Sequence, residues 1–394
     1  MRIALFEDSG WRDLWPFTRL RLIGELWWGM DSLAHKWQRY YGWEVVGYWP
    51  APDRPFWRPV VPPGPLCWIN ARLLPGSEEL ARWLRELRPE TLYVTAQGQP
   101  VAFCTPHTTL HEEGYPFPSR APTAPVPPEV PLLWISQVTD FFQLTGFVIQ
   151  TDWKHWRHRS APLPSWVSVR GQDNVFLHPT ARVGFACIDA EAGPVWIGPA
   201  AEIQDGVLLQ HTNAIGPYVT LLLGAKVRTH NSLGPFCKIG GEVGQSTFFG
   251  YSNKAHDGFV GHSVIGTWCN IGAGSNTSNL KNTYGPVQLY HIASGELRPT
   301  GLQFCGLIMG DYARCGIQTP FTTGCVVDLF ANVVSTGFTP KYVPAFYWGP
   351  GEFWQLDKAI ETAARMQKRR NLNLTEEEKA LLRYWWQRLV PTPS

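Results

Sequence analysis

From residue 197 to residue 239, an aliphatic residue recurs at every sixth position. The eight positions are Ile197, Ile203, Leu209, Ile215, Leu221, Val227, Leu233 and Ile239. An α-helix repeats its apolar face every 3.6 residues and a strand every two, so neither element explains the spacing. A period of six is typical of hexapeptide β-helices, in which each hexapeptide supplies one short strand and one corner. We therefore predict a left-handed parallel β-helix over residues 172–340.

The six-residue spacing breaks twice, and each break predicts a departure from the regular coil. It slips after residues 240–242 and returns at Ile265 and Ile271. It slips again after Gly274 and returns at Met309, so residues 275–301 must leave the coil as a loop. Interruptions of a solenoid often gather on its binding face. The segment between the two slips is therefore where we look for a site.

The rest of the chain follows shorter periods. Residues 1–153 alternate short apolar strands with an amphipathic helix at 77–88 that begins after Ser77, which predicts a layered α/β domain. Residues 154–171 read as a linker. Residues 341–394 form a C-terminal helical tail, and Thr375 with Glu378 predicts a capping box for its second helix. The tail caps the open end of the coil in the simplest interpretation, with partner contacts as the alternative.

Composition narrows the class of protein. The 394 residues are 44% hydrophobic and 17% charged, which suits a globular chain of two domains. A net charge of +2 without a Lys/Arg-rich block predicts no nucleic-acid partner. No run of 18 apolar residues and no signal peptide is visible, so we expect a cytoplasmic protein without membrane insertion. The eight cysteines form no CxxC pair, which argues against a zinc ribbon and favours reduced thiols.

Polar side chains gather between residues 240 and 281, where a plain solenoid needs none. Acyl transfer from a thioester to an amine requires a base, a donor for the oxyanion and cations for the anionic ends of the substrates. This segment supplies such groups at Lys254, His256, Asn270, Asn279 and Lys281. Backbone N–H groups at residues 272–274 are candidates for the oxyanion donor.

These residues resemble the hexapeptide-repeat sugar acyltransferases, in particular the bacterial bifunctional family that acetylates glucosamine-1-phosphate and then uridylylates it. His256 stands where that family has its base, and fourteen residues later Asn270 opens Asn-Ile-Gly-Ala-Gly, as in the family. The resemblance implies substrate contacts at Glu242, at Asn279 and at Lys226, where the family usually has Arg. It also implies acetyl-CoA or another acyl-CoA as donor, a sugar phosphate as acceptor, and a homotrimer.

One position departs from the family pattern. The substrate-binding Tyr expected three residues after the base is Phe259, and Tyr251 is a candidate replacement. We also expect Lys254 and Lys281 to contact substrate. His262 invites a zinc hypothesis, but six residues along the coil reach the next face, so such a metal would need ligands from two subunits.

Less specific interpretations stay open for several of these residues. His256 is a structural corner histidine in the simplest alternative. Asn270 and Asn279 are then members of asparagine ladders within turns, and Lys226 and Lys281 are solvated surface.

A divergent branch of the family resembles the chain over nearly its whole length, including GEVGQSTFFGYSNKAHDGFVGHSVIGTWCNIGAGSNTSNLKN and GLQFCGLIMGDYARCGI. That branch is described as a sugar nucleotidyltransferase with an acyltransferase domain. The resemblance therefore implies that the α/β domain at residues 1–153 is of the nucleotide-diphospho-sugar-transferase type. Its stretch PLTFTRPVAELR reads PFTRLRLIGELW here, at residues 16–27, with Arg21 and Glu25 retained. No GxGTR-like loop follows the first strand, so a nucleoside triphosphate site is predicted only weakly, from Arg21, Glu25, Asn70 and Arg72.

Asp152 is the candidate ligand for Mg²⁺ if the N-terminal domain is active. The main function hypothesis is therefore sugar N-acyl transfer linked to nucleotidyl transfer. The alternatives are a sugar-1-phosphate nucleotidyltransferase with a structural trimerising β-helix, and a scaffold in which both sites have decayed.

Overall fold

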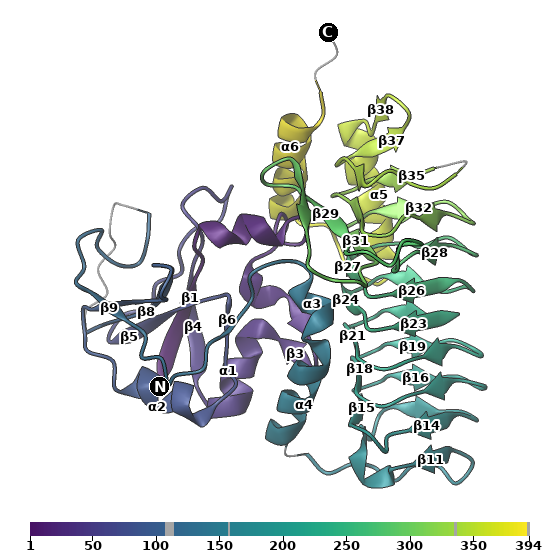
Figure 1. Cartoon of the computed structure of the whole chain (residues 1–394), viewed down its shortest axis with the longest axis horizontal. Coiled ribbons are helices and arrows are strands. Elements are labelled where there is room, and N and C mark those ends of the chain that lie inside the picture. The colour runs from purple at the N-terminus through teal and green to yellow at the C-terminus, as the bar shows by residue number, and fades with distance from the viewer. Residues whose placement is uncertain (107–113, 157, 335–336, 392–394) are drawn as a thin grey trace. The chain divides into compact units, whose positions relative to one another are not determined.

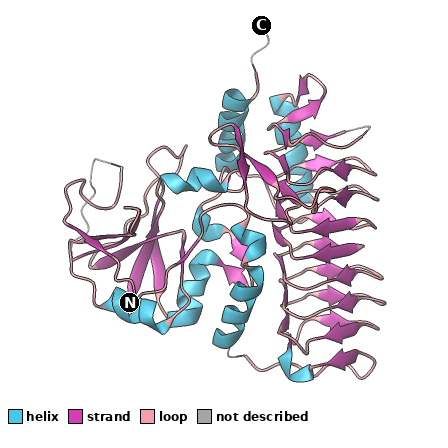
Figure 2. Cartoon of the chain, viewed as in Figure 1, coloured by secondary structure: helices cyan, strands magenta, loops and turns pink. Residues whose placement is uncertain are grey.

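A computed structural model describes residues 1–106, 114–156, 158–334 and 337–391, which fold as two compact units (Figures 1 and 2). Unit 1 comprises Met1–Leu14, Arg21–Leu26 and Asp31–Gln137. Unit 2 comprises Trp15–Leu20, Trp27–Met30 and Val138–Ser394. This division differs from the linear boundaries predicted above, because two short N-terminal segments and the stretch before residue 153 pack with the coil.

Unit 1 is built on a six-stranded sheet in the order β4-β1-β5-β8-β7-β9. Its strands are β1 (Arg2–Phe6), β4 (Glu44–Trp49), β5 (Leu66–Asn70), β7 (Leu92–Val94), β8 (Pro100–Thr105) and β9 (Thr123–Pro125). From β1 the chain passes through α1 (Leu33–Tyr41) to β4 on one side and then to β5 on the other, and both pair with β1 in parallel. Such a reversal is a topological switch point, which leaves a crevice beyond the carboxyl ends of the strands.

The local predictions for unit 1 hold at several elements. The helix predicted at 77–88 is α2 (Glu78–Arg85), and the Ser77 hydroxyl accepts the Leu80 N–H at 3.1 Å. The proline-rich stretch 105–131 begins with the last residue of β8, and its described residues beyond Thr105 form only β9, at the edge of the sheet, in agreement with the expectation that the stretch cannot form a central strand. Part of that stretch, residues 107–113, lies outside the described residues.

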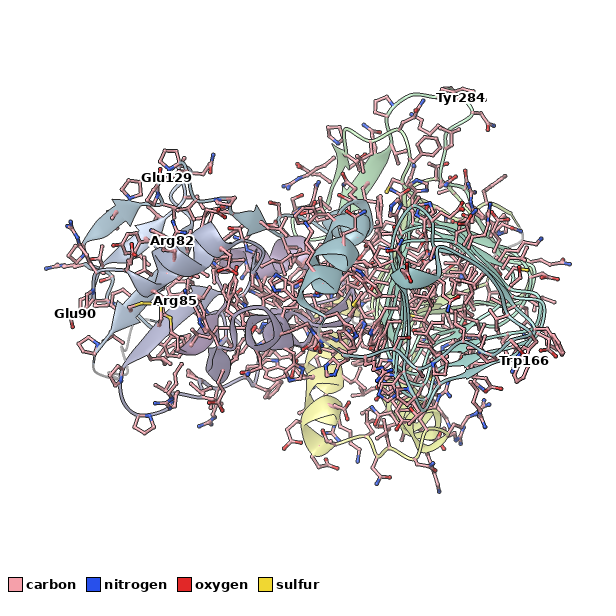
Figure 3. The ribbon with its side chains drawn as sticks, turned by 90° about the horizontal axis from the view of Figure 1, so that it is seen from below. Arg82, Arg85, Glu90, Glu129, Trp166 and Tyr284 are labelled. Carbon is pink, nitrogen blue, oxygen red and sulfur yellow. A yellow bond between two sulfur atoms is a disulfide. The ribbon has the colours of Figure 1, made fainter. Side chains whose placement is uncertain are left out.

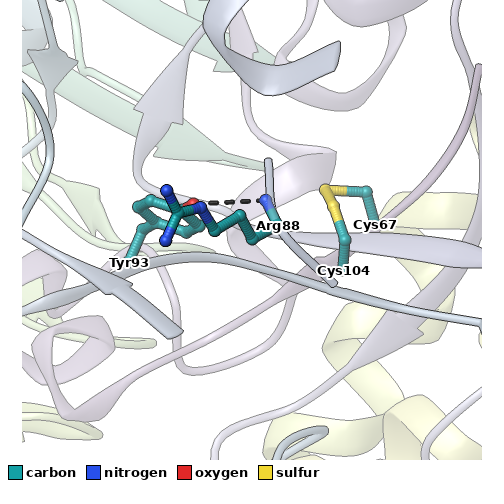
Figure 4. Close-up of a disulfide and its surroundings, with 4 residues drawn as sticks. All are labelled: Cys67, Arg88, Tyr93 and Cys104. Carbon is teal, nitrogen blue, oxygen red and sulfur yellow. Dashed lines mark hydrogen bonds between the residues drawn. A yellow bond between two sulfur atoms is a disulfide. The ribbon is translucent and has the colours of Figure 1, made fainter. Parts of the chain in front are cut away.

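A disulfide joins Cys67 of β5 to Cys104 of β8 (Figure 4). The prediction that all eight cysteines are reduced is therefore wrong for this pair. The two residues face each other directly across antiparallel strands, and side chains at such positions are close neighbours. A sequence separation of 37 residues gave no sign of this proximity. The six other cysteines are free thiols, as predicted.

The predicted β-helix in unit 2 is confirmed as a solenoid of about ten turns with three faces. Face 1 consists of β11 (Ser168–Arg170), β14 (Cys187–Asp189), β17 (Leu208–Leu209), β20 (Lys226–Val227), β23 (Glu242–Gly244) and β26 (Phe259–Gly261). Face 2 consists of β12 (Val175–Leu177), β15 (Val195–Ile197), β18 (Asn213–Ile215), β21 (Asn231–Leu233), β24 (Thr247–Gly250), β27 (Val264–Thr267), β31 (Leu307–Met309), β34 (Cys325–Val327) and β36 (Tyr342–Val343).

Face 3 consists of β13 (Arg182–Val183), β16 (Glu202–Ile203), β19 (Thr220–Leu221), β22 (Lys238–Ile239) and β25 (Asn253–Lys254). It continues through bridges at Asn270 to β32 (Arg314–Cys315) and β35 (Asn332–Val333). All eight aliphatic residues of the six-residue repeat lie in one core at 1% exposure or less. Full burial of each stabilises the fold by roughly 1.5–3 kcal/mol relative to exposure.

The first slip has a structural explanation. Beyond Ile239 the inward positions fall at Val243, Phe248, Lys254 and Val260, so the spacing shortens to four and five residues before it recovers. As a result, Lys254 takes the inward position that Ile239 holds one turn earlier.

The second break begins later than predicted, because β28 (Asn276–Thr277) still pairs with β33 (Pro320–Phe321) in the coil. The excursion that follows contains an antiparallel hairpin, β29 (Gln288–His291) with β30 (Glu296–Pro299). Tyr284 lies at its outer end and is 69% exposed (Figure 3). The predicted loop is thus confirmed, with a small sheet inside it.

The tail forms α5 (Leu356–Lys368) and α6 (Glu376–Leu389), after the hairpin of β37 (Tyr347–Gly349) and β38 (Glu352–Phe353). The capping box is present, since the Thr375 hydroxyl accepts the Glu378 N–H at 3.2 Å and the Glu378 carboxylate accepts the Thr375 N–H at 2.8 Å. Beyond α5, Arg370 donates to the Phe236 carbonyl and to Asn253 Oδ1, each at 3.2 Å. The tail therefore packs on face 3 as well as near the end of the coil.

The N-terminal segment of unit 2 is anchored by a buried ion pair. Arg19 donates to both carboxylate oxygens of Asp328 at 3.0 and 3.1 Å, and neither side chain is more than 1% exposed. The Arg19 guanidinium lies over the rings of Trp15 and Trp385, 4.2 and 4.6 Å from their centroids. The stretch that resembles PLTFTRPVAELR therefore supplies part of the coil's packing.

Candidate active site

His256 lies at the corner of the coil between faces 3 and 1. Its side chain is exposed, and its imidazole makes no hydrogen bond to any residue that the structure describes. The next corner stacks directly on it, because the Gly274 N–H donates to the Asp257 carbonyl at 2.9 Å. Parallel strands lie about 4.8 Å apart, so groups on the two corners are within reach of one small substrate.

The corner above His256 offers one backbone donor from the predicted segment 272–274. Gly274 N–H is occupied by Asp257, and Gly272 N–H approaches the Cys315 thiol at 3.3 Å. Ala273 N–H has no acceptor within the described part of the chain. Ala273 therefore provides the N–H best placed to stabilise an oxyanion, and the sequence had indicated it only as part of a segment.

Apolar side chains continue this column away from His256. Ile317 lies one turn beyond Ala273, because the neighbouring Gln318 N–H donates to the Ala273 carbonyl. The Ile317 side chain is 73% exposed. Val334 lies on the following turn, because the Gly316 N–H donates to the carbonyl of the neighbouring Val333. The Val334 side chain is 59% exposed. We call Ile317 and Val334 the apolar column. It exposes apolar surface on two neighbouring turns at this side of the coil.

Lys254 was predicted to contact substrate, but the structure buries it at 1% exposure inside the coil. Its ammonium donates to the His256 carbonyl at 2.5 Å. Burial lowers the pKa of Lys254 to about 8, and the nearby Asp257 offsets only part of that effect. We interpret Lys254 as holding the backbone at His256, because burial leaves its side chain no direct route to a substrate.

Lys226, Glu242 and Phe259 form an outward column on face 1, since each pairs with the next in register. Lys226 is exposed, as a phosphate ligand would be. Glu242 forms a half-exposed ion pair with Arg228 at 3.4 Å, which is weak enough to open for a ligand. The structure brings these three residues together as the family offsets imply.

Asn279 does not reach this column. Its amide donates to Nδ1 of His262 at 2.8 Å, and the His262 ring stacks on Phe304. Burial lowers the pKa of His262 to about 4, with a smaller contribution from Arg228, so this histidine is neutral at pH 7. The asparagine ladder considered above exists elsewhere, between Asn213 and Asn231. Lys281 lies in the excursion and donates to the Pro286 carbonyl at 3.3 Å.

Asn270 and Tyr251 lie on a different side of the coil, at a cavity of about 540 Å³ on face 3. The Asn270 side chain is exposed and makes no hydrogen bond to the described residues. Tyr251 stacks between Phe236 and Trp268 in a ladder of corner aromatics, with centroids 4.9 and 4.4 Å apart. Since Tyr251 and Phe259 occupy different faces, Tyr251 does not replace the missing hydroxyl within one copy of the chain.

Sequence reasoning missed the cations of this cavity. Its lining includes Lys238, Arg314, Arg369 and Arg370, and no carboxylate. Arg314 belongs to β32, whereas Arg369 and Arg370 follow α5. No motif joins these positions, and only the fold brings them together.

Unit 1 contains a second cavity, of about 390 Å³, at the switch point between β1 and β5. Asp8 and Gly10 follow β1, and Arg72 follows β5. Arg72 is 3% exposed and donates from Nε to Asp8 Oδ1 at 2.9 Å within a two-point ion pair. Arg72 thus lies where a nucleotide contact was predicted, but its charge is already neutralised.

The other weak nucleotide candidates do not line this cavity. Asn70 is fully buried and orders the turn after β5 by accepting the Arg72 N–H at 2.9 Å. Glu25 accepts the Leu22 N–H at 2.7 Å in a local turn, and Arg21 lies nearby. Their roles in nucleotide binding stay predictions.

Asp152 belongs to unit 2, where it is fully buried and accepts the Met30 N–H at 2.8 Å. Across the described residues, no group of three or more His, Cys, Asp or Glu side chains is arranged to hold a metal. No described helix is both long and apolar enough to cross a membrane.

Comparison with known proteins supports the resemblance. Residues 3–160 match the family model for sugar nucleotidyl transferases. The chain is similar to the bifunctional protein GlmU of Methanocaldococcus jannaschii, with 35% identity over 86 residues, which are 22% of this chain and 20% of that protein. It is also similar to GlmU of Exiguobacterium sibiricum, with 30% identity over 148 residues, 33% of this chain and 32% of that protein. These matches span a fifth to a third of the relatives' length.

Two solved structures overlap with the chain at low scores. The match to the UDP-N-acetylglucosamine acyltransferase of Francisella novicida covers 57% of this chain and 88% of that enzyme's chain, at 12% identity and a TM-score of 0.26. The match to the polysialic-acid-specific acetyltransferase NeuO covers 52% of this chain and 96% of the NeuO chain, at 14% identity and a TM-score of 0.26. In sequence, parts of the chain are therefore similar to GlmU proteins, and residues 3–160 match the family model for sugar nucleotidyl transferases.

Proposed function

We propose that the coil transfers an acyl group from an acyl-CoA, acetyl-CoA being the simplest, to the amino group of a sugar phosphate or sugar nucleotide. The observation that carries the proposal is the corner at His256. An exposed imidazole lies one turn below the N–H of Ala273, neither group has a partner among the described residues, and the apolar column extends from there. The family offsets of Glu242 and Asn270 add support.

In this mechanism the neutral imidazole of His256 accepts a proton from the acceptor amine as the nitrogen attacks the thioester carbonyl. The C–N bond forms, and the carbonyl oxygen becomes an oxyanion to which Ala273 N–H donates. The C–S bond then breaks, and the departing coenzyme A thiolate takes the proton from the imidazolium. The apolar column would hold the pantetheine arm along the coil.

The acceptor contacts favour assembly of more than one copy. Lys226 and Glu242 lie on face 1, whereas Asn270 lies on face 3. Two faces of one triangular coil point in different directions, so both sets meet one small ligand only if two copies contribute. We therefore propose a homotrimer, with a site between neighbouring copies. An acyl-CoA donor places the reaction in the cytoplasm.

Replacing His256 with Ala tests the proposal directly. General bases contribute on the order of 10²–10⁴-fold, so H256A should lower kcat by at least about 100-fold at unchanged fold, as judged by circular dichroism. His178→Ala, at another corner of the same coil, is the matched control and should keep full activity. An H256A variant with wild-type turnover of acetyl-CoA and amino-sugar phosphates would overturn the proposed mechanism.

Sugar nucleotidyl transfer is the second candidate activity, assigned to unit 1. It is favoured by the cavity at the switch point and by the family match over residues 3–160. Mg²⁺ in such sites is commonly held by one or two carboxylates together with substrate phosphates. Asp8 and Asp13 line the cavity and would hold the ion, which would neutralise the phosphate charge. Release of pyrophosphate from a nucleoside triphosphate and a sugar 1-phosphate is the assay.

A further inference from the structure

The cavity on face 3 concentrates positive charge without a counter-charge. Lys238, Arg314, Arg369 and Arg370 line it, and its lining includes no Asp or Glu. None of the four forms an ion pair with a described residue. Cations placed together repel one another and lose hydration, so this arrangement is unfavourable unless an anion joins it.

Arg314 shows the strongest sign of a missing partner. Its guanidinium lies near the rings of Phe330 and Trp354, 5.5 and 5.4 Å from their centroids. Among the described residues, its Nη2 donates only to the Tyr312 carbonyl at 3.4 Å and to the weakly accepting sulfur of Met366 at 3.1 Å. Its Nε is buried and has no acceptor in the same described part of the chain. A guanidinium has five N–H donors, so Arg314 retains unused capacity.

The simplest alternative is that these cations only dock the helix. Basic side chains after the last turn of α5 also interact favourably with the helix dipole. Arg370 does serve docking, through the Phe236 carbonyl and Asn253 Oδ1. Docking does not account for the side chains of Arg369 and Lys238, which are exposed and make no hydrogen bond within the described chain.

The cavity also offers groups that recognise a ring-bearing molecule. Tyr251 and Trp268 present aromatic surface, and the Asn270 amide is available to donate and accept. Ala255, which directly precedes His256, belongs to the same lining. A volume of about 540 Å³ suits a small ligand.

We infer that this cavity is a binding site for the phosphate group of a small ring-bearing ligand, with Arg314 and Arg369 as its phosphate ligands and Lys238 adding positive charge. The inference deepens the proposed acyl transfer and rests on it for the choice of ligand. A phosphate there comes either from the amino-sugar acceptor or from coenzyme A, because both are phosphate esters. The C-terminal helix thereby becomes part of a binding site, in addition to its packing role.

Calorimetric titration of the full chain tests this inference with two matched ligand pairs. Glucosamine 1-phosphate is compared with glucosamine, and coenzyme A with 3′-dephospho-coenzyme A. In the wild type, the phosphorylated member of one pair should bind at least about tenfold more tightly, as expected for charge-assisted hydrogen bonds. The pair that shows the difference identifies the source of the phosphate.

The double variant R314Q/R369Q should abolish that difference. The single variant R369Q, at an exposed position that cannot affect the core, should reduce it by about threefold or more. Lys368→Gln removes an equal charge from the neighbouring exposed position, outside the cavity, and should leave binding unchanged.

Three results would overturn the inference: no phosphate-dependent binding in the wild type, an undiminished difference in R314Q/R369Q, or an equal loss in K368Q. The H256A variant separates this inference from the proposed catalysis. Phosphate-dependent binding that persists in a fully active H256A would refute His256 as the base while it leaves the phosphate site standing.

Discussion

The two cavities of this chain differ in whether their cationic side chains have a carboxylate partner. In unit 1, Arg72 pairs with Asp8, and Arg54 pairs with Glu7 at full burial, so each guanidinium has its own carboxylate. In the face 3 cavity, Arg314 is half-buried and forms no ion pair with a described residue. The lining of this cavity therefore presents cations without a counter-charge, whereas the cavity of unit 1 presents a neutralised arginine and the additional carboxylate of Asp13.

This contrast has a physical consequence for phosphate ligands. A neutralised arginine attracts phosphate weakly, so under the proposed nucleotidyl transfer the cavity in unit 1 would need a metal ion to bring phosphate in. An arginine without a counter-charge gains by meeting phosphate, because the ligand restores the hydrogen bonds and charge balance lost on burial. Removal of one charged side chain should then lower the free energy of unfolding in unit 1 and raise it in the coil.

The largest effect is expected from breaking a pair in unit 1. Asp8→Ala leaves Arg72 buried without its carboxylate, and loss of one partner of a buried pair costs about 3–5 kcal/mol. The free energy of unfolding should fall by that amount, measured by denaturant titration of the full chain with hydrogen exchange at β1 and β5 as the local readout.

Two companion variants sharpen this test. Asp189→Ala, in the exposed pair with Arg170, should change the free energy of unfolding by less than about 1 kcal/mol. The double variant D8L/R72M removes both charges and should recover most of the loss. Equal losses in D8A and D189A would show that the neutralised pair is not the feature that distinguishes unit 1.

A smaller effect of opposite sign is expected in the coil. The pKa of Lys254 is about 8 when folded and near its usual 10.5 when unfolded, so the unfolded chain binds more protons between those values. The cost of burying the charge is fully present below pH 8 and disappears as the pH rises toward 10.5. Lys254→Met should therefore stabilise the fold at pH 7, by at most about 3 kcal/mol, and the gain should shrink over pH 8–10.5.

Denaturant titrations of wild type and K254M at pH 7 and pH 10 measure this directly. Ile239→Met, one turn earlier at the same inward position, is the control and should show no pH-dependent difference. A K254M variant that is less stable at both pH values would mean that the hydrogen bond to the His256 carbonyl outweighs the cost of burial.

Lys254 also shows where sequence reasoning reaches its limit. The six-residue rhythm predicted the coil and its core correctly from Ile197 to Ile239, because the inward position is read directly from the period. Within the slip, the spacing shortens to four and five residues, so counting no longer tells which side chain points inward. Lys254 was consequently predicted to contact substrate, although the coil buries it.

The residues of the candidate site also fall into two groups, those that a sequence motif predicted and those that only the fold brings together. His256, Glu242 and Asn270 were found from family offsets within one continuous motif. The cations of the face 3 cavity combine a strand at residue 314 with residues that follow α5, and no local pattern links such distant segments. The Cys67–Cys104 disulfide was missed for the same reason, since strand pairing creates its proximity.

The smallest effect concerns the dependence on metal. If unit 1 lacks available cations, a nucleoside triphosphate should bind it about tenfold more weakly when EDTA replaces Mg²⁺, because the ion offsets the repulsion from Asp13. The phosphate-dependent binding assigned to face 3 should change by less than about twofold, since arginines supply that charge. Calorimetry with UTP and glucosamine 1-phosphate, each with Mg²⁺ and with EDTA, measures both. Asp13→Asn should remove the metal dependence of UTP binding and leave glucosamine 1-phosphate binding unchanged. If both ligands depended equally on the metal, the two cavities would not differ in how they attract phosphate.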